Sequence, residues 1–190
     1  MKKFFGLYIT HSKYIFKFWV TQVTMSAFGL FIGFPSIATE KNWLIVISSI
    51  FAIAFLVFLL YDMMFMYGLS ESVRVYKDGR TPDKLKGLKI AMLSYAPTIL
   101  IITLYIISIL FNLQIVFIIT QSIMHFVIHG TYFLFFYILA DSIPLTLIAI
   151  ITLIPGIAAC TLGYYLGEKD LPIRKLLGIP VKPPKPPKNK

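Results

Sequence analysis

Two histidines stand four positions apart in the apolar stretch IMHFVIHG, which covers residues 123 to 130. On a helix, His125 and His129 would share one face, and Gln121 four residues earlier would extend the same ladder, so that His125 could hydrogen-bond to it. Two histidines at this spacing can bind zinc, and histidines can also carry protons. The stretch is therefore a metal site, a polar path, or a pair of buried hydrogen-bonding side chains.

A complete catalytic or metal site does not follow from these residues. A zinc site requires a third protein ligand, and the candidates are Asp62, Asp141 and Cys160. The stretch also lacks the glutamate that HExxH proteases place between their histidines as general base. We therefore predict no catalytic residue, no metal and no cofactor. We interpret four residues as a structural polar cluster or the lining of a path: Gln121, His125, His129 and Asp141.

The composition places these residues in a membrane protein. Of the 190 residues, 58% are hydrophobic and 16% aromatic, and the mean hydropathy is +0.82, so the apolar fraction exceeds that of an ordinary soluble domain. A bilayer core about 30 Å thick needs about 20 apolar residues per helix. Four segments meet this length, and we expect spans at residues 18–38, 43–68, 90–111 and 144–167.

The basic residues predict the orientation. All 18 Lys and Arg residues except Lys41 lie in three segments, residues 1–17, 69–89 and 168–190. Multi-pass proteins keep such positive charge on the cytoplasmic side of the membrane. An even number of crossings puts all three segments inside, so we expect a plasma-membrane protein with both termini in the cytoplasm.

This orientation decides how the apolar run 113–140 is interpreted. We predict an all-α integral membrane helical bundle with four transmembrane helices, in which 113–140 is a membrane-embedded re-entrant or broken helix. The run divides at His129-Gly130-Thr131 into two pieces of the length that is typical of re-entrant segments. The alternative is five transmembrane helices, with this run as a kinked fifth span.

Small residues predict how the spans pack. Gly29 and Gly33 form a GxxxG pattern in the first span, and Gly156 and Gly163 belong to a stripe of small residues in the last. Such residues let helix backbones approach closely in lipid, where van der Waals contact holds helices together. We therefore expect these four glycines at helix interfaces, and a bend in the last span at Pro155.

Basic segments flank the transmembrane domain, residues 18–167. We expect a basic amphipathic segment at 1–17 and a basic, Pro- and Lys-rich cytoplasmic tail at 168–190. Six residues of the loop 69–89 should contact anionic lipid headgroups or a partner, as should the tail: Arg74, Lys77, Arg80, Lys84, Lys86 and Lys89. We expect no nucleic acid, because the basic residues are not interleaved with exposed aromatic residues on a soluble domain.

The chain resembles small uncharacterised multi-pass membrane proteins of low-GC Gram-positive bacteria. The matching features are Gly79-Arg80, Lys86-Gly87-Leu88-Lys89 leading into a span, Leu166-Gly167, and the lysine-rich tail. The resemblance implies a location and an architecture, and no reaction. We expect a non-enzymatic accessory, scaffold or immunity-type protein that binds a membrane-protein partner or a second copy of itself. The alternative is a small transporter or channel-like component whose path is lined by His125 and His129.

Overall fold

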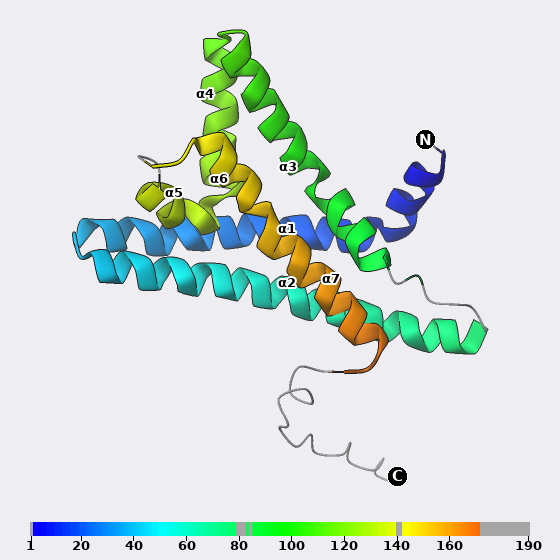
Figure 1. The fold of residues 1–190 in the computed structure, drawn as a ribbon. Coiled ribbons are helices and arrows are strands. Elements are labelled where there is room, and N and C mark those ends of the chain that lie inside the picture. The colour runs from blue at the N-terminus through cyan, green and yellow to red at the C-terminus, as the bar shows by residue number, and fades with distance from the viewer. Residues whose placement is uncertain (1, 79–82, 84, 140–141, 172–190) are drawn as a thin grey trace.

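The computed structural model describes residues 2–78, 83, 85–139 and 142–171. Every element among them is a helix, and none of these residues lies in a strand. Of the residues singled out in the sequence, Arg80, Lys84, Asp141 and the tail from residue 172 onward lie outside the described residues. The chain is an all-α bundle (Figure 1). Four of its helices are long and apolar enough to cross a membrane, and a bent pair of shorter helices would make a fifth span if the pair crosses as one.

Two long antiparallel helices form the base of the bundle. α1 (Lys2–Ala38) and α2 (Asn42–Asp78) each contain 37 residues, which is about 55 Å of helix at 1.5 Å per residue. In the short turn between them, Glu40 adopts a left-handed φ of 54°. Because a span needs about 20 residues, both helices extend beyond a bilayer core at the end opposite this turn.

The two helices extend beyond the spans that we expected. Residues 69–78, which we expected in a loop, continue α2, so Arg74 and Lys77 lie on a helix. The basic N-terminal segment is likewise continuous with α1. Between residues 61 and 78 the sequence contains one glycine, Gly68, and no proline, so nothing in it ends a helix. Hydropathy marks where a helix leaves the lipid and not where the helix ends.

The remaining elements cross this base at an angle (Figure 1). They are α3 (Lys86–Leu110), α4 (Gln114–Ser122), the π-helix η1 (Ile123–Ile128), the 3-10 turn η2 (Gly130–Tyr132), α5 (Phe133–Leu139), α6 (Leu145–Ile151) and α7 (Leu153–Glu168). α3 and α4 form a hairpin that stands away from α1 and α2. Its turn contains Asn112 with a left-handed φ of 52°, a conformation that asparagine accepts more readily than most residues. α7 runs back along the face of α2.

The last span is divided into α6 and α7 at Thr152. Pro155 explains the division, because it has no N–H to donate to the carbonyl of Ile151 and its ring crowds that preceding turn. At the division, the hydroxyl of Thr152 donates to the carbonyl of Ala149 at 2.8 Å. The 24 residues from Leu145 to Glu168 still meet the length and hydropathy of one membrane span.

α2 and α7 approach each other through glycines. A Cβ on Gly163 would lie 2.5 Å from the carbonyl oxygen of Tyr61, and a Cβ on Gly68 or Gly167 would meet the opposite backbone as closely. Backbones at this separation have no room for a side chain between them. Gly163 and Gly167, which belong to the stripe of small residues in the last span, therefore lie in a close contact between two spans, together with Gly68, which the sequence did not mark.

The other three glycines singled out in the sequence also lie between elements. A Cβ on Gly29 would collide with the backbone of Gly130, and one on Gly33 would lie 2.9 Å from the ring of Phe133. Gly156 faces the hydroxyl of Tyr95 on α3. The first span thus packs against the broken segment, and the last against both α2 and α3.

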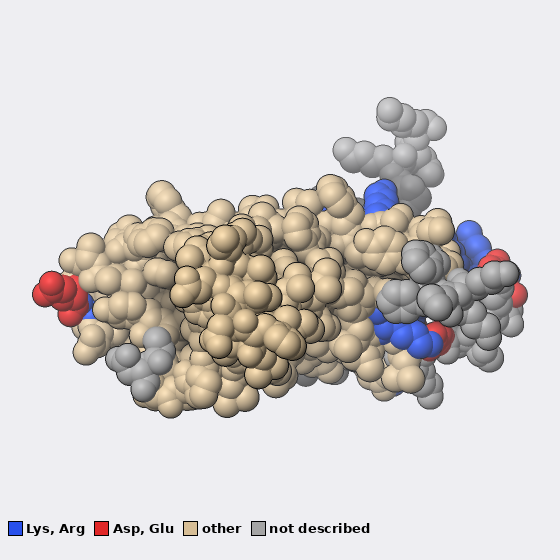
Figure 2. Space-filling view, turned by 90° about the horizontal axis from the view of Figure 1, so that it is seen from above, with Lys and Arg blue, Asp and Glu red and all other residues tan. Residues whose placement is uncertain are grey.

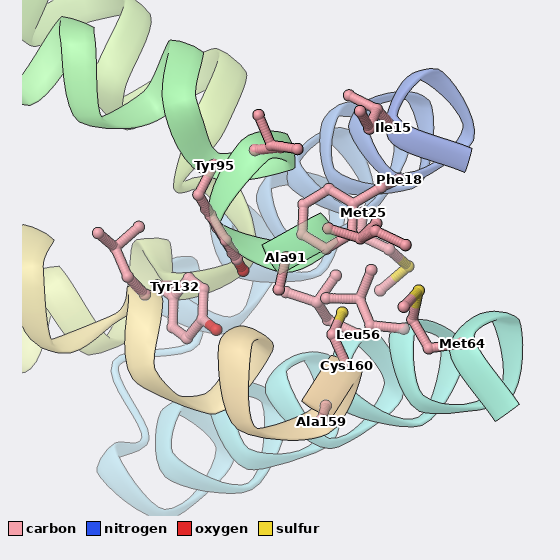
Figure 3. Packing of buried hydrophobic residues seen from close by; sticks show 14 of the residues in the cluster. Ile15, Phe18, Met25, Leu56, Met64, Ala91, Tyr95, Tyr132, Ala159 and Cys160 are labelled. Atoms are coloured by element: carbon pink, nitrogen blue, oxygen red, sulfur yellow. The ribbon is translucent and has the colours of Figure 1, made fainter. Parts of the chain in front are cut away.

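A hydrophobic core fills the crossing between the base and the other helices (Figure 3). Phe18 on α1 lies edge-on to Tyr95 on α3, with ring centroids 4.9 Å apart. Leu56 on α2 and Cys160 on α7 are buried in the same cluster. α1, α2, α3 and α7 all contribute residues to this core, so no two of them form a hairpin that packs independently of the others.

Charged residues lie at the two ends of the molecule. Figure 2 shows Lys, Arg, Asp and Glu at both ends of the long axis, and a band without charge between them on the face in view. The α1–α2 turn carries Glu40 and Lys41. We call the opposite end the basic end, where Lys13, Arg74, Lys77, Lys86 and Lys89 are among the described basic residues. An uncharged band between charged ends is typical of a protein that spans a bilayer.

Candidate functional site

The embedded segment is broken where the histidines lie. α4 and η1 run to Ile128, η2 and α5 follow from Gly130, and the two parts are bent by 80° relative to each other. The backbone N–H of His129 donates to the carbonyl of Met124, five residues earlier, at 2.8 Å. This π-helical turn was not expected from the sequence, although the break itself was. Single π-turns inside helices occur frequently at functional sites.

Ser26 on α1 holds the break in place. Its hydroxyl oxygen accepts a hydrogen bond from the backbone N–H of Gly130 at 2.6 Å and donates to the carbonyl of Phe126 at 3.1 Å. Lipid cannot satisfy backbone groups that have lost their helical partners, so such groups must bond within the protein. A glycine is required at 130, because a Cβ there would lie 2.5 Å from the carbonyl oxygen of Ser26.

His129 is buried at the break, with 1% of its surface exposed. Its Nδ1 lies 3.1 Å from Oγ1 of Thr152, at the junction of α6 and α7, and its ring packs against Tyr132 and Phe136. Nε2 has no hydrogen-bond partner among the described residues. An unsatisfied buried polar atom costs about 1 to 3 kcal/mol, so this nitrogen is the clearest sign in the segment of a position that could bind a ligand.

His125 has different surroundings from His129. Both histidine rings lie against Phe136 on α5, but only His129 is fully buried. His125 is partly exposed and lies edge-on to Phe136, with centroids 5.2 Å apart. Its ring faces the backbone of Gln121, and no hydrogen bond joins the two side chains. Across the described ranges, no group of three or more His, Cys, Asp or Glu residues could hold a metal ion.

Other buried polar groups lie on the helices around the break. Four side chains each have an oxygen without a hydrogen-bond partner in the described part of the chain: Gln22, Thr98, Thr131 and Tyr132. In Figure 3 the hydroxyl groups of Tyr95 and Tyr132 lie near each other, and that of Tyr95 lies against Gly156 of α7. With His129, these groups are buried donors and acceptors inside the bundle.

Polar residues lie at the surface at the C-terminal end of α4. Of the nine residues of α4, Thr120 alone is buried, and its hydroxyl donates to the carbonyl of Val116 at 2.7 Å. Gln121 is partly exposed and Ser122 is exposed. Neither of these two side chains forms a hydrogen bond with another described residue. They lie one helical turn before Phe126, which contacts Ser26 midway along the first span.

At the basic end, two of the six expected cationic residues are already paired. Lys86 pairs with Glu71, and both side chains are less than one-fifth exposed. The Nζ of Lys89 lies 2.6 Å from the Oδ2 of Asp83, and this ammonium group holds the pKa of the Asp83 carboxyl below its ordinary value. Arg74 and Lys77 form no ion pair with a described residue.

Sequence reasoning missed the residues that support the break. Ser26 and Thr152 are ordinary hydroxyl residues inside apolar spans, and neither belongs to a motif. One signal existed: Ser26 lies three residues before Gly29, on the helix face that the GxxxG pattern marks as an interface. The partner of that interface could not be identified without the fold.

Comparison with known proteins provides no assignment. The chain matches no family model, no curated protein and no solved structure. Its function is therefore inferred from the geometry of the break, of α4 and of the basic end.

Proposed function

We propose that this chain is a non-enzymatic accessory protein of the plasma membrane, which binds a transmembrane helix of another membrane protein along the exposed side of α4. It spans the membrane four times, its segment 113–140 is re-entrant, and both termini are cytoplasmic. The basic end then faces the anionic lipids of the cytoplasmic leaflet. The uncharged band in Figure 2 supports a membrane-spanning arrangement, and the excess of Lys and Arg in residues 1–17, 69–89 and 168–190 supports this orientation.

The observation that carries the proposal is the outward position of Gln121 and Ser122. Both lie at the end of α4 that leads into η1, whose Phe126 bonds to Ser26 on α1, and neither has a hydrogen-bond partner among the described residues. Amide and hydroxyl groups at this depth bond to neighbouring helices, each such bond contributing about 1 kcal/mol, because lipid offers no alternative. The α3–α4 hairpin also stands apart from the rest of the bundle, so a helix can reach it (Figure 1).

A photo-crosslinking amino acid tests this proposal in native membranes. Placed at Ile118, which is 61% exposed and lies one turn before Ser122, it should form adducts with one protein partner. Placed at Phe31 on α1, which is 78% exposed, it should react with lipid. Identical adducts from both positions would contradict the proposal, and adducts with a second copy of the chain would replace the proposed partner with a homo-oligomer.

Substitutions provide the matched control for the polar contact. Gln121→Leu and Ser122→Ala should each reduce the yield of the adduct at Ile118 several-fold. Thr103→Val removes an exposed hydroxyl that already donates to the carbonyl of Ile99 at 2.8 Å, so it should leave the yield unchanged. Equal effects of all three substitutions would assign the loss to general destabilisation.

A small transporter or channel-like component is the second candidate. It is favoured by the buried unsatisfied atoms of His129, Thr98 and Tyr132 inside the bundle. Polar groups at a helix break are the places where transporters bind ions and small solutes. Proton flux into liposomes containing the purified protein, lost on His129→Leu and retained on His125→Leu, would support this function, and the absence of flux in the unchanged protein would remove proton transport.

A further inference from the structure

A polar pocket lies between α1 and α2 at the basic end. Its volume is about 590 Å³. Lys13 and His11 line it from α1, Glu71 and Arg74 line it from α2, and Lys86 lines it from the first turn of α3. Residues from three helices therefore meet here, outside the apolar part of each span.

The charges in this pocket are unequally satisfied. Lys86 is held by Glu71 in an ion pair that is largely buried. Asp78 lines the outer part of the pocket and makes an interaction of its own. Lys13 and Arg74, in contrast, have no ion-pair partner in the described ranges. Two cationic side chains, one on each long helix, are thus available to a ligand.

Two tyrosines, Tyr14 and Tyr67, line the pocket and make defined contacts with its other residues. The hydroxyl of Tyr67 lies 2.9 Å from Nδ1 of His11, and the Tyr67 and Tyr14 rings pack with centroids 4.1 Å apart. The Nζ of Lys86 lies 5.8 Å from the centre of the Tyr67 ring. Tyrosines with one polar end are typical of the membrane interface, so the pocket opens at the level of lipid headgroups.

The ligand that fits these groups is a phosphate. A guanidinium group presents two parallel N–H donors that match a phosphate oxygen pair, and an ammonium group adds a mobile charge. Lys13 lines the pocket from α1 and Arg74 from α2, so one anion in the pocket can be reached by a cation from each helix. A dianionic ligand is less well matched, because the carboxylates of Glu71 and Asp78 also line the pocket.

We propose that this pocket binds the phosphodiester headgroup of an anionic membrane lipid through Lys13 and Arg74. The site rests on the proposed function, which places the basic end at the cytoplasmic leaflet where anionic lipids concentrate. The site holds one lipid at a defined position, whereas the basic end without it would attract lipid headgroups without selectivity.

Native mass spectrometry of the purified, delipidated protein tests the site. Titration with phosphatidylglycerol should show one lipid bound more tightly than phosphatidylcholine. Lys13→Gln and Arg74→Gln should each weaken that binding about tenfold, the usual effect of losing one charge-assisted hydrogen bond. Lys17→Gln and Lys77→Gln are matched controls that remove the same charge from the same two helices outside the pocket, and they should change binding less than twofold.

Three outcomes would overturn the site. Equal weakening by all four substitutions would show non-selective attraction to the basic end, and no weakening by any of them would remove Lys13 and Arg74 as ligands. Should inorganic phosphate compete with phosphatidylglycerol at equal concentration, the ligand would be a soluble phosphate and not a lipid. Arg74→Lys, which keeps the charge and loses the paired donors, gives an intermediate affinity if Arg74→Gln fails to fold. The measurement uses isolated protein, so it does not depend on the partner of α4 or on the orientation of the chain.

Discussion

Ser26 on α1 accepts a hydrogen bond of 2.6 Å from the backbone N–H of Gly130, 104 residues later in the chain. The same hydroxyl donates to the carbonyl of Phe126, so one side chain satisfies the backbone on both sides of the break. A broken helix in lipid depends on such a contact, because water is not present to replace it. The contact between the first span and the embedded segment is therefore specific, and it fixes where the break lies.

Removing this hydroxyl should loosen the break. Ser26→Ala leaves the N–H of Gly130 and the carbonyl of Phe126 without their partner, and we expect a loss of about 1 to 2 kcal/mol in the free energy of unfolding. Unfolding in detergent micelles by denaturant measures this loss. Thr103→Val, whose hydroxyl bonds within its own helix, should cost less than about 0.5 kcal/mol. Equal costs for the two variants would contradict the role of Ser26.

A side chain placed in the contact between α2 and α7 should lower the free energy of unfolding more than Ser26→Ala does. Gly163→Ala places a Cβ 2.5 Å from the carbonyl oxygen of Tyr61, so the helices must separate. We expect a loss of about 2 kcal/mol or more, as for other overpacked interfaces. Gly6→Ala makes the same change in α1, where nothing lies within 4 Å, and should be neutral or slightly stabilising. A tolerated Gly163→Ala would show that the α2–α7 contact is looser than described.

The hydrogen bond between His129 and Thr152 should appear as a coupling energy. Thr152→Val removes the hydroxyl that lies 3.1 Å from Nδ1 of His129, and should cost about 1 kcal/mol. In the His129→Leu background the same substitution should cost less, because only the bond of the Thr152 hydroxyl to the carbonyl of Ala149 is then lost. A double-mutant cycle from denaturant unfolding gives the difference. Equal costs in both backgrounds would mean that the two side chains do not interact.

The pair of Asp83 and Lys89 predicts a small dependence of stability on pH. Lys89 and the backbone N–H of Leu85 hold the pKa of the Asp83 carboxyl below its ordinary value. A depressed pKa contributes stability above the ordinary value, and that contribution is lost as the pH falls through the lowered pKa. Because both side chains are half-exposed, Asp83→Asn should cost less than about 1 kcal/mol at neutral pH. The difference from the unchanged protein should disappear in acid, and a difference that persists there would exclude this ion pair as its cause.

The fold was predictable where it depends on length, hydropathy and charge. The four spans and the broken segment follow from apolar runs that end at charged or turn residues, and Gly163 follows from a stripe of small residues. The extent of α2 was not predictable from hydropathy, since residues 69–78 are polar and yet remain helical. The π-turn was also missed, because the tertiary contact of Ser26 with Gly130 supports it and no local sequence signal marks it.

The candidate site was predictable only in its location. The sequence marked His125 and His129 as a pair, and the structure places both rings against Phe136, with His125 partly exposed and His129 buried. The partners that define their surroundings, Thr152 and Phe136, come from elements whose packing depends on the whole bundle.

The orientation of the bundle underlies the proposals for α4 and for the basic end, and cysteine accessibility in intact cells tests it most directly. The one native cysteine, Cys160, is fully buried and should not react. With a membrane-impermeant maleimide, Asn112→Cys and Ser142→Cys, which flank the embedded segment at exposed positions, should both be labelled from outside the cell. Lys77→Cys should be labelled only after permeabilisation. Labelling of Asn112→Cys from outside and of Ser142→Cys only from inside would show that the segment crosses the membrane as a fifth span, and would contradict the account.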